Sequence, residues 1–510
     1  MKIKYYMLIC ILLGCFLSSC SDSIEFEVNC VLNPNKISPL TALLSVDSED
    51  NGIIKTVVNG EIPIENTYNK TTRIAEIPLL GLYPNADNVV DIIFEKGNIS
   101  SKKSLLIKTS SVPQDFPGIK VNKCNKEKME PGFHACDFHM ANRGNFHTSP
   151  FIFDDNGKIR WYLDLGFIKK MAGPFQKFQN GDIVVGTRNN IFRFDMLGNV
   201  VKKIDTNPLY GIHHDLLEMS DGKILALVGK RNQSALINGE KMNTDNDFMI
   251  LLEKDSPKIL KEWDNAKILD INRNDINTTR KNDWTHTNSV YFNPSDSSIV
   301  ISAKNQGVVK HSWDNELEWI LAPHRNWGKA GRSGEGVYTK DYLLTAVDSK
   351  NKAYNKDVQM GLVSHEDFDF PWGQHAARYL PNGNLILFDN GSPRNYNKED
   401  SYSRVVEYEI DEKNKTVKQV WQYGKERGEQ LFSKIVSDVD YLPKTGNILM
   451  TSGYIIDDEL NQSSKLIEIN KSTNEEVFEA TLTLKTLRGN KSPIWGQTDI
   501  LYRSQRMELK

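Results

Sequence analysis

The sequence predicts an all-β protein in which a six-bladed β-propeller follows a small N-terminal β-sandwich. Short apolar runs of strand length recur along the chain with turn residues between them, and helical periodicity is lacking. From about residue 119 these runs form a loose repeat, which for antiparallel strands is typical of a propeller. The 510 residues suffice for a large core and for two domains.

Residues 1–19 are predicted to be a lipoprotein signal peptide. A short basic start precedes an apolar stretch that is too short to span a bilayer. Residues 17–20, Leu-Ser-Ser-Cys, resemble a bacterial lipobox, which implies cleavage before Cys20 and acylation of its thiol. We therefore expect an exported lipoprotein on the periplasmic or cell-surface side of a bacterial outer membrane. A simple signal peptide with a chance cysteine is the alternative.

The cysteines of the mature chain suggest one candidate disulfide. Export permits disulfides, and Cys124 and Cys136 are separated by only a short loop. Cys30 lies outside this pair, and the alternative is that no disulfide forms at all. No Cys-x-x-Cys pair or Cys/His cluster is present, so no metal site is predicted.

Residues 20–112 are predicted to form the β-sandwich. Runs such as 89–94 and 104–107 have the length and composition of strands, and turn residues such as 84–87 separate them. The Pro- and Gly-containing residues 113–118 are predicted to be the linker to the second domain.

Residues 119–510 are predicted to form the propeller, with about six blades. Five repeat units are recognised by the residues near which they begin, namely Gly173, His214, His286, His375 and Ser437. A sixth unit requires both ends of the region: residues 134–165 supply strands, and 495–502 supply an inner strand that closes the ring.

Three histidines, His214, His286 and His375, occupy the same place in their repeat units, a few residues before a turn. The innermost strands of a propeller line a central channel, so these side chains are expected to converge. Three imidazoles that titrate near neutrality suit binding of an oxyanion or a metal, or nucleophilic and acid–base chemistry. The alternative is that each is an ordinary hydrogen-bonded core residue.

Two cations accompany these histidines. Lys304 follows the second strand of the His286 unit and is predicted to be an anion ligand. Arg378 comes three residues after His375, so strand alternation turns it away from that histidine. Arg378 is therefore a candidate substrate-binding residue for which a structural salt bridge is the favoured interpretation.

Two further polar residues are candidates for substrate binding. His213 adjoins His214 and should point to the other face of its strand, in a supporting position. Asn390 lies in the motif Asp389-Asn390-Gly391, which either orients a histidine or forms a turn.

Charge and missing motifs exclude several functions. The net charge is −3 and the isoelectric point about 6.4, so no basic field is available for nucleic acid. The chain has no Gly-x-Ser-x-Gly elbow, no Walker loop and no His-Glu-x-x-His motif. The Cys/Ser-x-Pro-x-Arg motif of the formylglycine sulfatases is also lacking.

With these residues in hand, the chain resembles the bacterial PAPS-independent arylsulfate sulfotransferases over nearly all of its mature length. The motifs that carry the resemblance, in order, are residues 78–88, 213–215, 283–290, 301–306, 373–376 and 388–391. The resemblance implies a six-bladed propeller with a small β-sandwich. It also implies transfer of a sulfuryl group from a phenolic sulfate ester to another phenol, without a nucleotide or redox cofactor.

The resemblance also implies roles for the site residues. His375 matches the nucleophile, which becomes transiently sulfated in a ping-pong reaction. His214 and His286 match histidines that bind the sulfuryl oxygens and assist proton transfer. Lys304 stands where the family usually has an arginine; lysine keeps the charge but loses the planar, bidentate fork.

Two other functions compete with this interpretation. A non-catalytic surface propeller would bind sulfated or other anionic ligands without turnover, and the lysine at position 304 favours it. A hydrolase or lyase could use the same histidines. A sulfotransferase releases phenol from an aryl sulfate faster when a second phenol is added, a binder releases none, and a hydrolase releases it without dependence on the acceptor.

Overall fold

The computed structural model describes residues 23–142, 145–168, 172–245, 247–273, 281–397, 401–458, 461–486 and 496–510. The predicted signal peptide and Cys20 lie outside these residues. In the described part of the chain, no helix is long and apolar enough to cross a membrane.

The N-terminal domain is a sandwich of two antiparallel sheets, as predicted. One sheet has the order β1-β2-β5 and the other β4-β3-β6-β7. The strands are β1 (Glu27–Leu32), β2 (Ala42–Asp47), β3 (Gly52–Val58), β4 (Ile64–Lys70), β5 (Ile74–Leu79), β6 (Asp87–Lys96) and β7 (Ile99–Lys108). In β2, Ala42, Leu44 and Val46 are buried while the residues between them are half-exposed, because alternate side chains of a strand face opposite sides.

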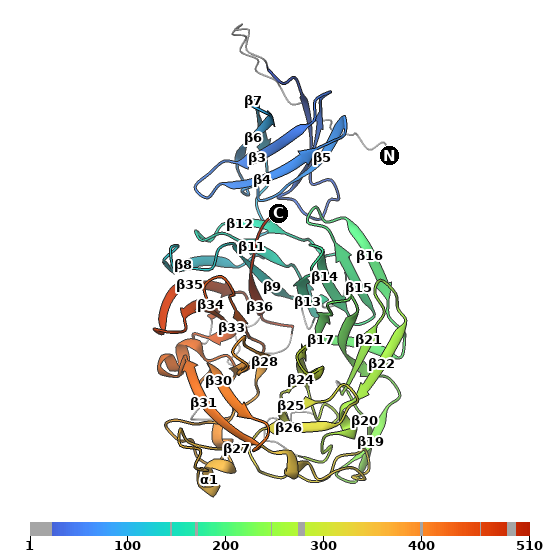
Figure 1. Ribbon diagram of the computed structural model, residues 1–510, viewed down its shortest axis with the longest axis vertical. Coiled ribbons are helices and arrows are strands. Elements are labelled where there is room, and N and C mark those ends of the chain that lie inside the picture. Colours follow the sequence, from blue (N-terminus) through green and yellow to red (C-terminus); the bar gives the residue numbers. More distant parts are fainter. Residues whose placement is uncertain are drawn as a thin grey trace.

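Six further sheets form the ring of the propeller, which confirms the predicted fold class (Figure 1). Four blades follow the chain without interruption. The strands of each blade are given from the innermost outward. The first blade has β13 (Ala172–Lys177), β14 (Ile183–Thr187), β15 (Asn190–Phe194) and β16 (Val200–Asp205), and the second has β17 (Tyr210–Glu218), β18 (Ile224–Lys230), β21 (Phe248–Leu252) and β22 (Ile259–Asp264). The third has β23 (Thr287–Asn293), β24 (Ser298–Ala303), β25 (Gly307–His311) and β26 (Leu317–Leu321), and the fourth has β28 (His375–Tyr379), β29 (Leu385–Asp389), β30 (Arg404–Asp411) and β31 (Thr416–Tyr423).

The remaining two blades combine the two ends of the propeller region. In the fifth blade, β8 pairs with the outer strand β35; in the sixth, β36 pairs with β9 as the inner strand (Figure 1). The fifth contains β32 (Asp438–Tyr441), β33 (Ile448–Ile456), β34 (Gln462–Asn470), β35 (Glu475–Leu484) and β8 (Gly118–Cys124), and the sixth β36 (Ile500–Met507), β9 (Phe133–Asn142), β10 (Asn145–Thr148), β11 (Phe151–Phe153) and β12 (Ile159–Tyr162). The predicted closure by a C-terminal inner strand is thus present, and β8 adds a second closure that the sequence analysis did not foresee.

Short elements decorate the ring. They are the hairpin β19 (Ser234–Ile237) and β20 (Glu240–Asn243), the short strand β27 (Thr345–Ala346), the helix α1 (Lys356–Gln359), and the 3-10 turns η1 (Asn265–Lys267), η2 (Thr339–Tyr342), η3 (Arg394–Tyr396) and η4 (Lys425–Leu431). The second strands of the blades are almost wholly apolar, as in β24 and β29, because neighbouring blades cover both of their faces.

A buried arginine connects the sandwich to the propeller. Arg160 of β12 donates hydrogen bonds to the carbonyl oxygens of Gly81 (2.7 Å) and Ile62 (2.8 Å). Its guanidinium also pairs with Asp154 at 3.0 Å and lies 3.6 Å from the ring centroid of Tyr83. Because this side chain is fully buried and satisfied from both domains, it holds the sandwich against the sixth blade.

The candidate disulfide between Cys124 and Cys136 is not formed, and both thiols are free. Cys124 ends β8 and is exposed, with its Sγ 3.7 Å from the Sδ of Met129. Cys136 is buried in β9, opposite Phe151 and Ser504. The two cysteines are close in sequence but belong to different blades, because β8 joins β35 while β9 pairs with β36.

Candidate functional site

The inner strands that carry the three histidines share one irregularity. The pairing register of β17 shifts between Ile212 and Leu216, that of β23 between Thr287 and Ser289, and that of β28 between His375 and Arg378. Each shift is a β-bulge, which re-aims the side chains at that point of the strand.

At or next to each bulge, the backbone adopts a conformation that L-residues seldom adopt. His214 has φ 47°, His286 has φ 46° and Ala376, next to His375, has φ 57°. Non-glycine residues in the left-handed region are costly and concentrate at functional sites. The same strained turn therefore recurs where each blade presents its histidine.

The histidines converge as predicted. The ring centroids of His214 and His286 are 4.8 Å apart. The ring of Tyr502, from β36, lies 6.2 Å from that of His214 and 6.4 Å from that of His375, so this tyrosine is close to both histidines. We call His214, His286 and His375 the histidine group.

The hydrogen bonds of His375 fix which of its nitrogens carries the proton. Its Nδ1 lies 2.7 Å from Oδ1 of Asn390. The Nδ2 of Asn390 donates to the carbonyl oxygens of Ser433 (2.7 Å) and Val436 (3.0 Å), so the amide oxygen must face the histidine. An amide oxygen only accepts hydrogen bonds, so Nδ1 carries the proton and Nε2 keeps its lone pair.

The environment keeps His375 neutral. Burial lowers its pKa to about 3, and the positive charges of Lys304 and His286 act in the same direction. Burial also lowers the pKa of His214 well below its ordinary value, again helped by neighbouring histidines. A neutral, oriented imidazole is a nucleophile across the whole physiological pH range.

The other two members of the group have different partners. The Nδ1 of His286 lies 2.6 Å from Oδ2 of Asp283, and this contact orients the ring. The Nδ1 of His214 lies 2.9 Å from Nδ1 of His213. His213 therefore supports His214 by direct contact. The prediction that the two side chains point to opposite faces is wrong, because the bulge breaks the alternation of the strand.

Lys304 supplies positive charge beside the group. Its backbone N–H donates to the carbonyl oxygen of His286 at 3.1 Å, and its side chain runs past Gly373, two residues before His375. Burial lowers the pKa of Lys304. Within the described residues no carboxylate forms an ion pair with its ammonium group, which leaves that charge available to an anion.

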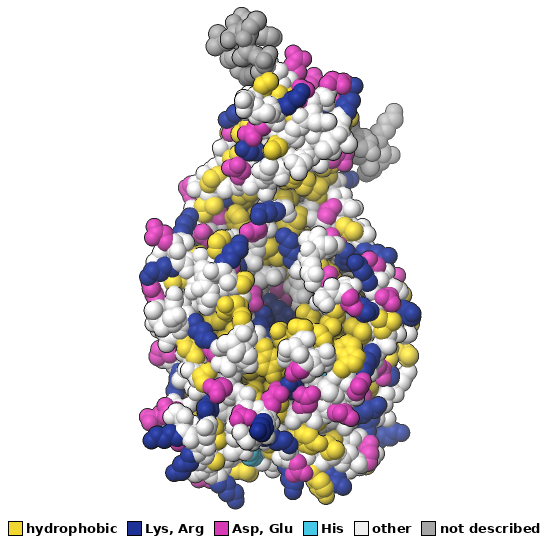
Figure 2. All heavy atoms as spheres, viewed as in Figure 1, with side chains coloured by type: hydrophobic (Ala, Val, Ile, Leu, Met, Phe, Trp, Pro, Cys, Tyr) yellow, Lys and Arg dark blue, Asp and Glu magenta, His cyan; other side chains and the backbone are white. Residues whose placement is uncertain are grey.

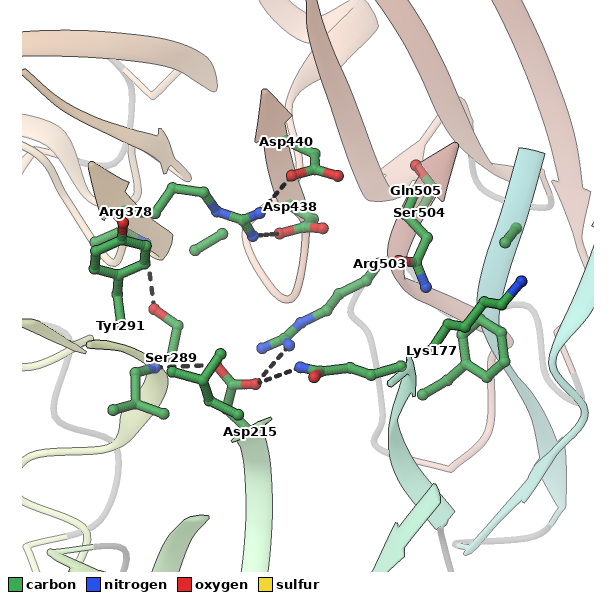
Figure 3. Close-up of a pocket in the computed structure, with 17 residues that line it drawn as sticks. Lys177, Asp215, Ser289, Tyr291, Arg378, Asp438, Asp440, Arg503, Ser504 and Gln505 are labelled. Atoms are coloured by element: carbon green, nitrogen blue, oxygen red, sulfur yellow. Dashed lines mark hydrogen bonds and ion pairs between the residues drawn. The ribbon is translucent and has the colours of Figure 1, made fainter. Parts of the chain in front are cut away.

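Beyond the histidine group, the channel is crossed by ion pairs. Arg503 pairs with Asp215 at 2.7 Å, and Arg378 pairs with Asp438 at 3.0 Å and with Asp440 at 2.6 Å (Figure 3). These five residues, the ion-pair layer, border a cavity of about 280 Å³. Figure 2 shows a hollow at the centre of the ring, with charged side chains in its floor.

The contacts of Arg378 and of the motif at 389–391 decide between the interpretations left open for them. Arg378 takes the structural salt bridge and does not join the histidine group. In the motif at 389–391, the residue that orients a histidine is Asn390, and all of its amide groups are occupied by protein atoms. Asp389 instead accepts hydrogen bonds from Arg394 and Arg404, at 2.9 Å each.

Three residues at the site were missed by the sequence analysis, namely Asp283, Tyr502 and Arg503. Asp283 precedes His286 by three residues, and an acidic residue at that spacing could have been recognised in the sequence as a partner of the histidine. Arg503 donates a hydrogen bond to Asp215 at 2.7 Å. It also donates to the carbonyl oxygens of His214 and Asn288, and each of these two contacts is 3.4 Å long. Neither it nor Tyr502 has a counterpart in the other repeat units, so no pattern pointed to them.

Buried neutral histidines predict acid sensitivity of the fold. Burial lowers four histidine pKa values to about 3 or about 4, those of His134, His213, His375 and His311. In the unfolded chain these side chains bind protons near pH 6.5, so the unfolded state holds more protons than the folded state below that pH. Their stabilisation is complete above pH 6.5 and is lost as pH falls toward 4, by up to about 1.4 kcal/mol per pH unit for each histidine.

Urea unfolding at pH 7.5, 6.5, 5.5 and 4.5 measures this effect. We expect the midpoint to fall slightly between the first two values and much more steeply below them. A midpoint that is equal at pH 7.5 and pH 5.5 would contradict the burial of these histidines in the neutral form.

No group of three or more His, Cys, Asp or Glu side chains in the described ranges is arranged to hold a metal ion. The site instead combines an oriented neutral imidazole, an imidazole backed by a carboxylate, and an ammonium group that forms no ion pair with the described residues. On a propeller channel, this set suits an enzyme that binds and transfers an anionic group.

Comparison with known proteins identifies the group of enzymes. Residues 120–495 match the family model described as arylsulfotransferase (ASST), and residues 29–110 match the arylsulfotransferase Ig-like domain. The chain belongs to the arylsulfotransferase family, a family of sulfuryl-transferring enzymes. The resemblance seen in the sequence is thereby confirmed, whereas the lipoprotein anchor stays a prediction.

Two curated relatives span most of the chain. Arylsulfate sulfotransferase AssT of Lelliottia amnigena and that of Escherichia coli O6:H1 (strain CFT073) are each 27% identical to it, over 87% of this chain and 88% of theirs. Among solved structures, a protein of unknown function from Bacteroides caccae covers 68% of this chain and 93% of its own, with a TM-score of 0.39 and 10% identity. That likeness is too weak to bear on fold or function.

Proposed function

We propose that this enzyme moves a sulfuryl group from a phenolic sulfate ester to another phenol by a ping-pong reaction, with a sulfohistidine at His375 as the intermediate. The observation that carries the proposal is the orientation of His375 by Asn390, which leaves Nε2 with a free lone pair in a site that keeps the ring neutral. The family and the two relatives, which are named for arylsulfate transfer, support the choice of substrates.

The first half-reaction transfers the sulfuryl group to the enzyme. Nε2 of His375 attacks sulfur, the bond between sulfur and the aryl oxygen breaks, and the phenolate leaves with that electron pair. The imidazole ring becomes positively charged, and its Nδ1–H bond to Asn390 strengthens as that charge develops. Phenolates are good leaving groups, so positioning and neutralisation of charge supply most of the acceleration.

The surrounding cations serve the sulfuryl oxygens and the proton. Lys304 has no ion-pair partner among the described residues and offsets the negative charge of the sulfuryl oxygens. His286 and its partner Asp283 give a proton to the departing phenolate and later remove one from the acceptor phenol. In the second half-reaction the acceptor oxygen attacks sulfur, and the N–S bond returns its electrons to Nε2.

Trapping the intermediate tests the proposal. Purified protein is exposed briefly to 4-nitrophenyl sulfate, and its peptides are analysed by mass spectrometry. We expect the mass of one sulfuryl group on the peptide that contains His375, together with release of nitrophenol. Addition of phenol should discharge the adduct and speed further release.

The outcomes separate the competing functions. Neither adduct nor nitrophenol would refute the proposal and favour a propeller that only binds anions. Nitrophenol release at a rate independent of added phenol would instead indicate a hydrolase. His324 provides a matched control: its ring is held by the carbonyl oxygen of Leu344, and its peptide should stay unmodified.

A further inference from the structure

We infer that Tyr502 is a further catalytic residue, whose phenolic hydroxyl donates a hydrogen bond to an oxygen of the sulfuryl group during transfer. This inference rests on the proposed function and adds a fourth blade to the site. It concerns a residue from β36, the strand that closes the ring.

The backbone at Tyr502 has the same irregularity as the histidine strands. The register between β36 and β9 shifts between Leu501 and Arg503, so Tyr502 sits at the bulge. Its ring lies edge-on to His375, with an interplanar angle of 74°, and is tilted at 55° to His214. The bulge therefore presents Tyr502 to the channel as the other bulges present their histidines.

The hydroxyl of Tyr502 is buried without a hydrogen-bond partner among the described residues. Only 4% of the residue is exposed. The hydroxyls of two other tyrosines do have protein partners: Tyr68 donates to the carbonyl oxygen of Pro78 at 2.8 Å, and Tyr408 to that of Asp369 at 2.6 Å. A buried hydroxyl is costly to leave unpaired, so one beside a reactive histidine calls for a partner that arrives with the substrate.

The hydroxyl of Tyr502 must be protonated to donate a hydrogen bond, and its surroundings favour that form. Burial raises the pKa of Tyr502 well above its ordinary value; the charge of Arg503 opposes this effect, whereas the carboxylates of the channel act in the same direction as burial. The hydroxyl therefore keeps its proton at neutral pH. It can donate a hydrogen bond but cannot serve as the base for the acceptor phenol.

The position of the sixth blade completes the surroundings of the sulfuryl group. Lys304 and His286 belong to the third blade, and the sixth blade lies three places away around the ring in either direction. In an in-line displacement the three sulfuryl oxygens spread around the reaction axis. The third blade contacts this group from one side, and Tyr502 contacts it from the other, with its ring held over the guanidinium of Arg503 at 5.4 Å.

The test is the substitution Tyr502→Phe, which removes one oxygen and keeps the ring. We expect kcat to fall about 10²-fold with little change in KM, because the lost hydrogen bond forms in the transition state. The thermal midpoint should stay equal or rise, because no protein hydrogen bond is lost. A residue that only supports the fold would give the opposite result.

Two comparisons sharpen the test. Tyr162→Phe makes the same change in the same blade, at a ring packed on Phe116 outside the channel, and should leave kcat unchanged. A series of 4-substituted phenyl sulfates should show the same loss for every leaving phenol, because the sulfuryl group is common to all.

Three results would overturn the inference. They are an unchanged kcat, a fall in the thermal midpoint that accounts for the loss, and a loss that grows with the pKa of the leaving phenol. The last would move the hydrogen bond to the aryl oxygen. Formation of the His375 adduct by the unsubstituted protein shows separately that the proposed function stands.

Discussion

Replacement of His375 by alanine should lower kcat for transfer from 4-nitrophenyl sulfate by about 10⁴-fold or more. The variant loses the only group that, in the proposed reaction, bonds to sulfur. Asn390, Lys304 and His286 remain in place, but they can only bind the donor. KM should therefore change much less than kcat.

The design of this measurement separates chemistry from folding. His324→Ala removes a half-buried histidine outside the channel and should keep nearly full activity. Free imidazole fits the space left by the missing ring in His375→Ala and should restore part of the phenol release. Retention of more than about a tenth of the original kcat by His375→Ala would exclude a covalent role for this residue.

Replacement of Asp389 by alanine should produce the largest loss of stability, about 3–5 kcal/mol. Asp389 is fully buried, and its Oδ2 accepts hydrogen bonds from Arg394 and Arg404, which are each 1% exposed. Its Oδ1 accepts from the backbone N–H groups of Trp372 (2.8 Å) and Gly391 (3.0 Å). Without this carboxylate, Arg394 keeps an ion pair with Asp369, while Arg404 keeps only uncharged acceptors among the described residues, such as the side-chain oxygens of Gln419 and Gln422.

Thermal unfolding followed by circular dichroism checks this prediction. Asp205→Ala is the control, because the ion pair of Asp205 with Lys203 is exposed and such pairs contribute little. The control should leave the midpoint unchanged, while Asp389→Ala should lower it by many degrees or prevent folding. Equal midpoints for the two variants would show that the buried arginines find other partners.

Much of the fold could be predicted because the propeller repeats. Apolar second strands such as β24 and β29, followed or preceded by tight turns, recur at each blade, and the recurrence alone brings His214, His286 and His375 to one channel. The repeat also indicated that a distant C-terminal strand closes the ring. The second closure by β8 could not be foreseen, because an outer strand at a blade edge carries no distinctive pattern.

The parts of the site that escaped prediction depend on bulges and on side-chain partners. Strand alternation separated His213 from His214, but the bulge in β17 brings their Nδ1 atoms to 2.9 Å. The sequence Trp-Gly-Gln occurs at 372–374 and again at 495–497. Aligning the two copies places Thr498 at the position of His375, whereas the residue of β36 that lies beside His375 is Tyr502. A single extra residue in a strand changes which side chain faces the channel, and the sequence does not mark it.

The pairing of β36 with β9 makes the site depend on a contact between the two ends of the propeller region. Leu501 is opposite Phe138, so these strands meet across most of the propeller region, and contacts of such long range form slowly. Until they meet, Asp215 has no Arg503 to hold it and the histidines have no Tyr502 beside them. A partly folded chain that already displays its histidines therefore still lacks the two side chains that β36 brings to the site.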